Sequence, residues 1–190
     1  MLTVGDVVIS GSGFLLLFLS DLFQAYRRPH SARLVSIFGY GGVGAALFFL
    51  VVAFRPAAIG EAGAIAEIGA AALFSLLLLY SVLVEIPFAL RRLRPKGGPE
   101  RRVFAGGTYS VVRHPGFIWF LGLAASLMII YRDSAVTIAS VAMILMNLTL
   151  VTCEDRWLFP RIFHDWEAYQ RTVPFLIPRL RCGGRSSKGS

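Results

Sequence analysis

The feature that most constrains this chain is a series of long, uninterrupted apolar runs. In the whole sequence 56% of the residues are hydrophobic and only 16% are charged, with a mean hydropathy of +0.66. Soluble domains have about a quarter of their residues charged, so the composition indicates a membrane protein. Because the apolar residues are continuous rather than alternating, we expect helices and not a β-barrel. The predicted fold class is therefore an all-α integral membrane protein.

The runs divide into about five spans, each near the ~20 residues that a helix needs to cross a hydrocarbon core of about 30 Å. The third run is interrupted by Glu67 and Glu85. The last two are joined only by residues 132–134, so they should form a tight helical hairpin. The predicted spans cover approximately residues 7–23, 34–54, 64–90, 115–131 and 135–153.

Basic residues gather in alternate loops, which indicates how the spans are oriented. Loops 24–33 and 91–114 are strongly basic, whereas the charges in loops 55–63 and 132–134 cancel. The positive-inside rule then places the N-terminus outside and the C-terminus in the cytoplasm. The same rule accounts for the net charge of +8, so we predict membrane lipid as a partner and no nucleic acid. No obligatory protein partner is predicted.

Composition also divides the chain into three parts. Residues 1–90 hold the first three spans. Residues 91–180 hold a long basic loop, the helical hairpin and an amphipathic tail rich in aromatic residues, and we expect this part to be the catalytic half. Pro160 is expected to interrupt the helix of the tail. Residues 181–190 are polar and rich in Gly and Ser, and are expected to be disordered.

Two polar clusters lie at span ends that face the same, cytoplasmic, membrane surface. Arg113-His114-Pro115 opens the fourth span; it is either a topogenic anchor or, with the positive helix N-terminus, a site for a carboxylate or phosphate. Glu154-Asp155 ends the fifth span, where the helix dipole disfavours carboxylates. This pair either forms salt bridges in solvent or binds a cationic group or acts as a base. If the two clusters meet, they form a site.

Ionisable residues within the spans are further candidates, because burying them in lipid is costly. Glu85 and Asp21 both lie near cytoplasmic ends, where an arginine or water is also within reach. Glu67, near an outer end, is interpreted as structural. The three histidines are scattered, so no metal site is predicted, and two cysteines do not make a disulfide framework.

The second half of the chain carries three motifs in order, over about residues 101–178. Together they resemble the integral-membrane methyltransferases related to isoprenylcysteine carboxyl methyltransferase and the phospholipid N-methyltransferases. The first three spans match that family only in general character. The motifs are Gly107-x-Tyr109-x-x-x-Arg113-His114-Pro115-x-Phe117, Glu154-Asp155-x-x-Leu158 and Trp166-x-x-Tyr169-x-x-x-Val173-Pro174.

The resemblance implies that S-adenosyl-L-methionine binds between the start of the fourth span, the end of the fifth and the tail. Glu154, with Asp155 beside it, would hold the amino-acid end of the cofactor, where a carboxylate suits an ammonium group. Arg113 would face the cofactor carboxylate or a substrate anion, and Arg113 and Glu154 are the predicted catalytic residues. The other predicted cofactor contacts are Val103, Phe104, Tyr109, His114, Pro115, Gly116 and Phe117, and the predicted substrate contacts are Glu85, Trp166 and Tyr169.

Departures from the family pattern bear on the methyl acceptor, which is expected to be a lipophilic or small membrane-accessible molecule. Phe117 stands where the family usually has Tyr. Leu150 stands one turn before the acidic pair, where isoprenylcysteine enzymes place an arginine for the substrate carboxylate. A prenylcysteine-like acceptor bound in the same way is therefore disfavoured relative to a phospholipid amine, another neutral or amine-bearing lipid, or a thiol.

Two alternatives stay open. Membrane sterol reductases use NADPH and have a related C-terminal half, and Asp165-Trp166 and Phe175 match their tail better than the methyltransferase pattern. Those reductases are much larger than this chain. The basic loop 91–102 does not distinguish the reductases from the methyltransferases, since its charges could also face the phosphates of NADPH. The second alternative is a non-enzymatic membrane protein that keeps the fold.

Overall fold

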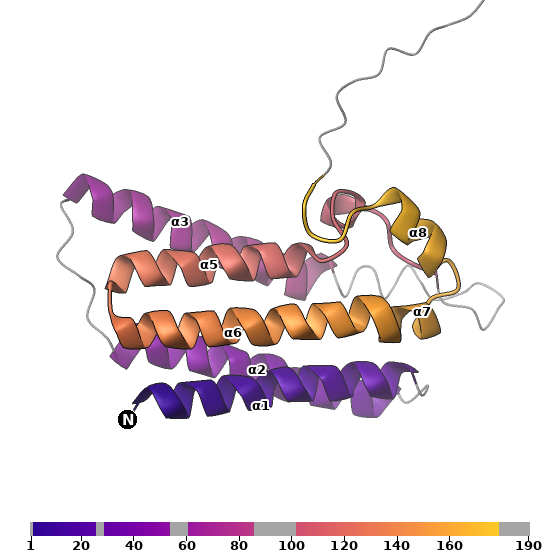
Figure 1. Ribbon diagram of the computed structural model, residues 1–190, viewed down its shortest axis with the longest axis horizontal. Coiled ribbons are helices and arrows are strands. Elements are labelled where there is room, and N and C mark those ends of the chain that lie inside the picture. Colours follow the sequence, from indigo (N-terminus) through magenta and orange to yellow (C-terminus); the bar gives the residue numbers. More distant parts are fainter. Residues whose placement is uncertain (1, 26–28, 54–60, 86–101, 179–190) are drawn as a thin grey trace, which may run out of the picture.

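The computed structural model describes residues 2–25, 29–53, 61–85 and 102–178, and within these residues the regular structure is all helical. The long helices run side by side along the longest axis of the molecule, and the short elements gather at one end of them (Figure 1). The long helices are α1 (Leu2–Ala25), α2 (Pro29–Ala53), α3 (Glu61–Tyr80), α5 (Pro115–Tyr131) and α6 (Ser134–Cys153). The short elements are η1 (Ser81–Glu85), η2 (Gly107–Ser110), η3 (Glu154–Leu158), α7 (Phe159–Ile162) and α8 (Trp166–Thr172).

The all-helical class is confirmed, and each predicted span corresponds to a helix. α5 coincides with the fourth predicted span and α6 begins one residue before the fifth. The third prediction, 64–90, is described only as far as Glu85, and the predicted tail 181–190 lies outside the described residues. By length and composition, two helical stretches could cross a membrane, Leu34–Ala53 and the continuous Ser134–Ile162. Shorter apolar helices cover Gly11–Phe23, Ile65–Tyr80 and Pro115–Tyr131.

The prediction that Pro160 interrupts the tail helix is wrong, because the helix continues from α6 through η3 to Ile162. η3 is a π-helical turn, in which the Phe159 N–H donates to the Glu154 carbonyl. Pro160 then occupies the first turn of α7, a position where a helix loses little from a missing N–H. The helix ends at Phe163, which has extended backbone angles (φ −114°, ψ 125°).

Two apolar clusters hold the bundle together. The larger one joins α1, α2, α5 and α6 around the fully buried Leu50 and Met143, and an edge-to-face contact between Phe14 and Phe120 crosses it. The second joins α5 to α3 through Leu123, Leu127 and the partly buried side chains packed on them. α6 therefore lies between α1 and α5, and its C-terminal end lies beside the C-terminal end of α1.

Helices α1 and α2 approach each other closely at glycines. A Cβ atom on Gly13 would lie 2.9 Å from the Gly39 carbonyl oxygen, and one on Gly39 would lie 2.8 Å from the Leu17 side chain. Small residues allow helix backbones to approach in this way. One turn further on, a hydrogen bond joins the hydroxyls of Ser20 and Ser36. The part of α1 that carries Asp21 is therefore firmly placed in the bundle.

Candidate functional site

The segment before α5 brings Arg113 and His114 to the end of the bundle where the short elements gather. It turns through η2, where Gly107 has a positive φ of 59° that suits glycine. The Arg113 N–H then donates to the Pro174 carbonyl oxygen at 2.9 Å, which joins this segment to the tail. His114 is the N-cap residue of α5, and the buried Pro115 follows in the first turn, where proline is favoured.

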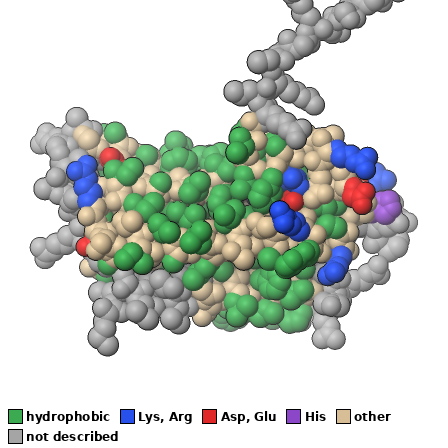
Figure 2. All heavy atoms as spheres, in the orientation of Figure 1, with side chains coloured by type: hydrophobic (Ala, Val, Ile, Leu, Met, Phe, Trp, Pro, Cys, Tyr) green, Lys and Arg blue, Asp and Glu red, His purple; other side chains and the backbone are tan. Residues whose placement is uncertain are grey.

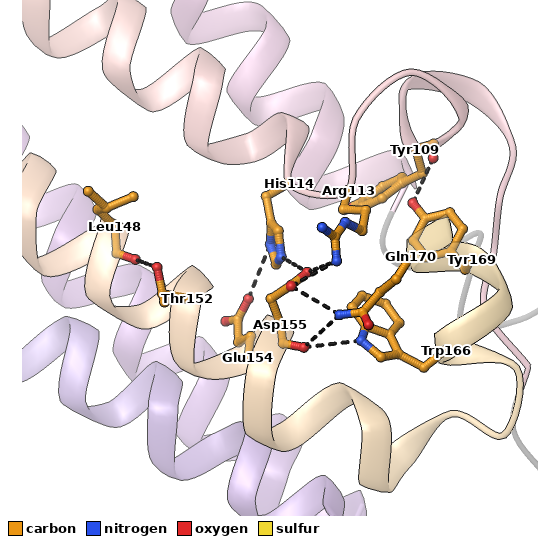
Figure 3. A network of polar contacts seen from close by, with 10 residues as sticks. All are labelled: Tyr109, Arg113, His114, Leu148, Thr152, Glu154, Asp155, Trp166, Tyr169 and Gln170. Atoms are coloured by element: carbon orange, nitrogen blue, oxygen red, sulfur yellow. Dashed lines mark hydrogen bonds and ion pairs between the residues drawn. The ribbon is translucent and has the colours of Figure 1, made fainter. Parts of the chain in front are cut away.

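Asp155 is the centre of a polar network that joins α5, η3 and α8 (Figure 3). Arg113 Nη1 donates to both of its carboxylate oxygens at 2.8 Å, and Gln170 Nε2 donates to Oδ2 at 3.1 Å. His114 Nε2 lies 3.3 Å from Oδ1. The Asp155 carbonyl oxygen accepts from Trp166 Nε1 and from Gln170. The Arg113 and Asp155 side chains are only 12% and 9% exposed, so this is a buried ion pair.

His114 lies between the two carboxyl groups of the acidic pair. Its Nε2 faces Asp155, and its Nδ1 is 3.6 Å from Glu154 Oε2. The ring is stacked on Phe159 at an interplanar angle of 9° and meets the edge of Phe175. Burial lowers the pKa of His114, and the charge of Arg113 adds to this, against the hydrogen bond and charge of Asp155, which raise it. A neutral His114 that donates from Nε2 to Asp155 presents the unprotonated Nδ1 to Glu154.

The tail forms a small aromatic core of its own against the segment before η2. Trp166 and Tyr169 are 3% and 6% exposed and pack with Val173, Phe159 and Phe163. The Tyr169 hydroxyl donates to the Tyr109 carbonyl oxygen at 2.6 Å, and burial raises the pKa of Tyr169. The Val103 N–H donates to Asp165 Oδ1 at 2.8 Å. These contacts fix the tail over the start of α5.

A cavity of about 390 Å³ opens beside the Arg113–Asp155 pair. Phe175 is among its lining residues, 5.5 Å from the Arg113 guanidinium carbon to the ring centre. Within the described residues, Arg113 Nε is buried without a hydrogen-bond acceptor, so the guanidinium retains unused donor capacity. The cavity is lined by Arg113, Thr152, Asp155, Arg156, Gln170 and Phe175.

Glu154 is not among the residues that line this cavity, and its helical turn, η3, contacts α1. Its side chain is 14% exposed, and the side chain of Asp21 from α1 lies near it. The site thus has two parts: an arginine-lined cavity next to Asp155, and the neighbouring carboxyl groups of Glu154 and Asp21. His114 lies between them.

The predicted site residues fall into three groups in the structure. Four are in mutual contact through the network: Arg113, His114, Glu154 and Asp155. Val103, Tyr109, Trp166 and Tyr169 make the contacts that hold the tail, and Phe104 packs edge-on to Tyr109. Pro115, Gly116 and Phe117 form the first turn of α5, with Pro115 and Phe117 buried. Glu85 closes η1, and its side chain lies outside the described residues.

The sequence reasoning missed Thr152, Arg156 and Gln170, which line the cavity, and it gave Phe175 no site role of its own. A signal for three of them was present. Thr152 and Arg156 are one turn from each other and share a helix face with Asp155, and Gln170 is one turn after Trp166. Helical spacing from the predicted residues would have found them.

Comparison of the chain with protein-family models, with curated proteins and with solved structures finds no match. The resemblance to membrane methyltransferases therefore stays a prediction that depends on the motifs themselves.

Proposed function

We propose that the chain is an integral membrane protein with about five spans, its N-terminus outside and its site on the cytoplasmic face. The two long apolar helical stretches support this, as do large apolar side chains on the outer faces of α2 and α3, such as Phe38 and Ile65, which are 68% and 74% exposed. Figure 2 shows apolar side chains over the middle of the visible face and charged ones mostly toward its ends. Lipid contact would account for so much exposed apolar surface.

The topology can be tested with two exposed serines at opposite ends of the α5–α6 hairpin, Ser110 and Ser134. In a background with Cys153 and Cys182 replaced by serine, Ser110→Cys should react with a membrane-impermeant maleimide only after the cytoplasmic face is opened. Ser134→Cys should react in intact cells. The reverse pattern, or reaction of both from one side, would contradict the proposed orientation.

We further propose that the protein transfers a methyl group from S-adenosyl-L-methionine to a lipophilic or small membrane-accessible acceptor. A phospholipid amine, another amine-bearing or neutral lipid, or a thiol is favoured as the acceptor over a prenylcysteine-like carboxylate. The observation that carries this is the convergence of Arg113, His114, Glu154 and Asp155, from two motifs about forty residues apart, together with a cavity of about 390 Å³ beside the Arg113–Asp155 pair. Ligand sites commonly have volumes of about 300–1,000 Å³.

The residues present fit the charge pattern of that cofactor. Its amino-acid part carries an ammonium and a carboxylate; Glu154 suits the first, and the free donor capacity of Arg113 suits the second. Phe175 lines the cavity and offers aromatic surface against which a flat heterocyclic ring would pack. When bound, S-adenosylmethionine supplies a methyl group on a positively charged sulfur, open to in-line displacement.

The protein itself would contribute positioning and exclusion of water. Asp155 holds Arg113, His114 and Gln170 in one arrangement, so the groups around the cavity are oriented before a ligand arrives. The tail, anchored through Tyr169 and Pro174, packs over part of the network and would shield a ligand in the cavity from water on that side. These two effects can provide most of the acceleration of a displacement reaction.

The proposal is tested by calorimetric titration of the purified protein in detergent with S-adenosylhomocysteine and, separately, with NADPH. We expect micromolar binding of S-adenosylhomocysteine, weakened at least tenfold in Glu154→Gln, which removes the charge and keeps the size. Glu167→Gln, at an exposed position of α8, is the matched control and should bind like the unmodified protein.

The other possible binding results would indicate a different function or a different site assignment. Binding of NADPH alone would move the protein to the reductase alternative. Binding of neither ligand would favour a non-enzymatic membrane protein. Full binding by Glu154→Gln would leave the methyltransferase class standing and reject the assignment of Glu154.

A further inference from the structure

Two hollows of different character share one residue of the tail. The first is the cavity of about 390 Å³ beside the Arg113–Asp155 pair, whose lining is largely polar. The second is a cleft of about 310 Å³ formed by residues 174–177, all four of which are apolar. Phe175 lines both hollows. A ligand that reaches past this side chain would therefore meet charged groups on one side and an apolar surface on the other.

The polar cavity carries an uncompensated positive charge. Both carboxylate oxygens of Asp155 accept from Arg113 Nη1 at 2.8 Å, so these two charges cancel. Arg156 lines the same cavity and is exposed, and within the described residues no ion pair includes it. A guanidinium group pairs most strongly with a phosphate or a carboxylate. The cavity is therefore suited to an anionic group beside Arg156.

The apolar cleft needs a hydrocarbon partner. Its residue Ile177 is 82% exposed, and Leu176 beside it is half-buried. Contiguous apolar surface of this kind is typical of sites that are covered by a ligand, a protein or lipid. A single molecule that fits both hollows has an anionic group at one end and a hydrocarbon chain at the other. Phospholipids combine the two, and they supply the anionic groups at a cytoplasmic membrane surface.

We propose that Arg156 and residues 174–177 form a phospholipid-binding site, with the phosphate beside Arg156 and an acyl chain in the cleft. The headgroup amine, which is attached to the phosphate, would then lie in the cavity next to the Arg113–Asp155 pair. That this lipid is the methyl acceptor rests on the function proposed above, whereas the binding of the lipid does not. A small thiol would use neither part, so Arg156 and the cleft would set the specificity for the acceptor.

The experiment is mass spectrometry of the intact protein in a maltoside detergent, which contains no phosphate, with three probes and no methyl donor. Dioctanoylphosphatidylethanolamine has both parts of the ligand, dioctanoylglycerol has only the chains, and glycerophosphoethanolamine has only the headgroup. We expect the complete lipid to bind about tenfold more tightly than dioctanoylglycerol, because a charge-assisted contact is lost. Glycerophosphoethanolamine should bind about a hundredfold more weakly than the complete lipid, because no chain is buried.

Matched variants assign each part of the ligand to its part of the site. Arg156→Gln should weaken binding of the complete lipid but not of dioctanoylglycerol, and Arg156→Lys should restore much of it. Arg161→Gln, at an exposed arginine of α7 outside the cavity lining, should change neither. Ile177→Asn should weaken both lipids with chains, whereas Val111→Asn, at a residue that is 52% exposed and lines neither hollow, should not.

Equal affinity for the complete lipid and dioctanoylglycerol, or an unchanged affinity in Arg156→Gln, would overturn the phosphate contact. Equal affinity for the complete lipid and glycerophosphoethanolamine would overturn the role of the cleft. Binding of none of the probes would also overturn the inference, and would mean that something other than lipid covers the cleft. Lipid binding by a protein that does not bind S-adenosylhomocysteine would leave this site standing and reject the methyltransferase proposal.

Discussion

Each end of the α5–α6 hairpin carries an arginine and an aspartate, and the two ends use them differently. At the turn, Asp133 Oδ1 accepts from the N–H groups of Ala135 and Val136 at 2.7 and 3.2 Å, so it caps the helix that it precedes. Arg132 Nε lies 3.3 Å from the Ile129 carbonyl oxygen, and the arginine is exposed. Every one of these contacts spans four residues or fewer.

At the other end the partners are far apart in the chain. Arg113 and Asp155 are 42 residues apart and are both buried, and Tyr169 donates to a carbonyl 60 residues away. Polar groups that form hydrogen bonds within a few residues of each other cap a helix, and this structural role is enough to explain their presence. Buried polar groups brought together from distant segments are costly to assemble, so their presence favours a binding role for this end. The turn at residues 132–134 therefore serves as an internal control for the site.

The largest difference should follow from removing the two aspartates in turn. Asp155→Ala leaves the Arg113 charge buried without its carboxylate, which typically costs about 3–5 kcal/mol. Asp133→Ala removes a helix cap, which typically costs about 1 kcal/mol. Denaturant unfolding in mixed micelles followed by circular dichroism measures both changes. Equal losses of stability would mean that the site network is no more than a surface ion pair.

Acid should destabilise the site through His114. Its pKa is lowered in the folded protein, so the unfolded chain takes up the proton first as the pH falls below about 6.5. Stability from this residue is therefore complete above that pH and is lost below it, by at most about 1.4 kcal/mol per pH unit. The Tm of His114→Gln should fall less between pH 7.5 and 5.5 than that of the unmodified protein. His164→Gln, at an exposed histidine, should keep the original slope; an unchanged slope in His114→Gln would contradict this.

Two buried tyrosines offer a closely matched pair. Tyr169 donates to the Tyr109 carbonyl oxygen at the site, and Tyr131 donates to the Val51 carbonyl oxygen at 2.9 Å near the turn. Replacing either with phenylalanine should cost about 1 kcal/mol. Only Tyr169→Phe should also weaken S-adenosylhomocysteine binding, because it loosens the tail over the site. Equal binding by the two variants would show that the tail anchor has no part in the ligand site.

The smallest effect is expected at Arg132, the non-glycine residue with a left-handed backbone among those described (φ 49°). Glycine is the residue that helices prefer at such an end. Arg132→Gly should change thermal stability by less than about 1 kcal/mol, because relief of strain offsets the added freedom of the unfolded chain. Ligand affinity should stay the same, and a clear loss of affinity would remove the contrast between the two ends.

Much of the fold followed from the sequence, because uninterrupted apolar runs leave few choices. The prediction for 115–131 was right at both ends, since Pro115 and the Arg132-Asp133 turn are strong local signals. The prediction that Pro160 interrupts the helix was wrong, because the effect of a proline on a helix depends on whether a wider π turn precedes it. No local sequence pattern reveals such a turn.

The candidate site could be predicted only in part. Arg113, His114, Glu154 and Asp155 stood out as charged residues at span ends, and the expectation that the two clusters meet is confirmed by their contacts. That Asp21 lies near Glu154 depends on the close packing of α1 against α6, which helical periodicity does not determine. The direction in which the Glu154 side chain points likewise depends on the π-helical winding of η3, which the sequence pattern does not show.

The most direct test of the account is ultraviolet cross-linking of tritiated S-adenosylmethionine to the protein in membranes, followed by peptide mapping. We expect label in peptides that cover residues 103–117 or 152–175, removed by excess S-adenosylhomocysteine and greatly reduced in Arg113→Ala but not in Arg132→Ala. Label that competes in the same way but maps to the turn at residues 131–134, or to α2 and α3, would contradict the claim that this end of the bundle binds the methyl donor.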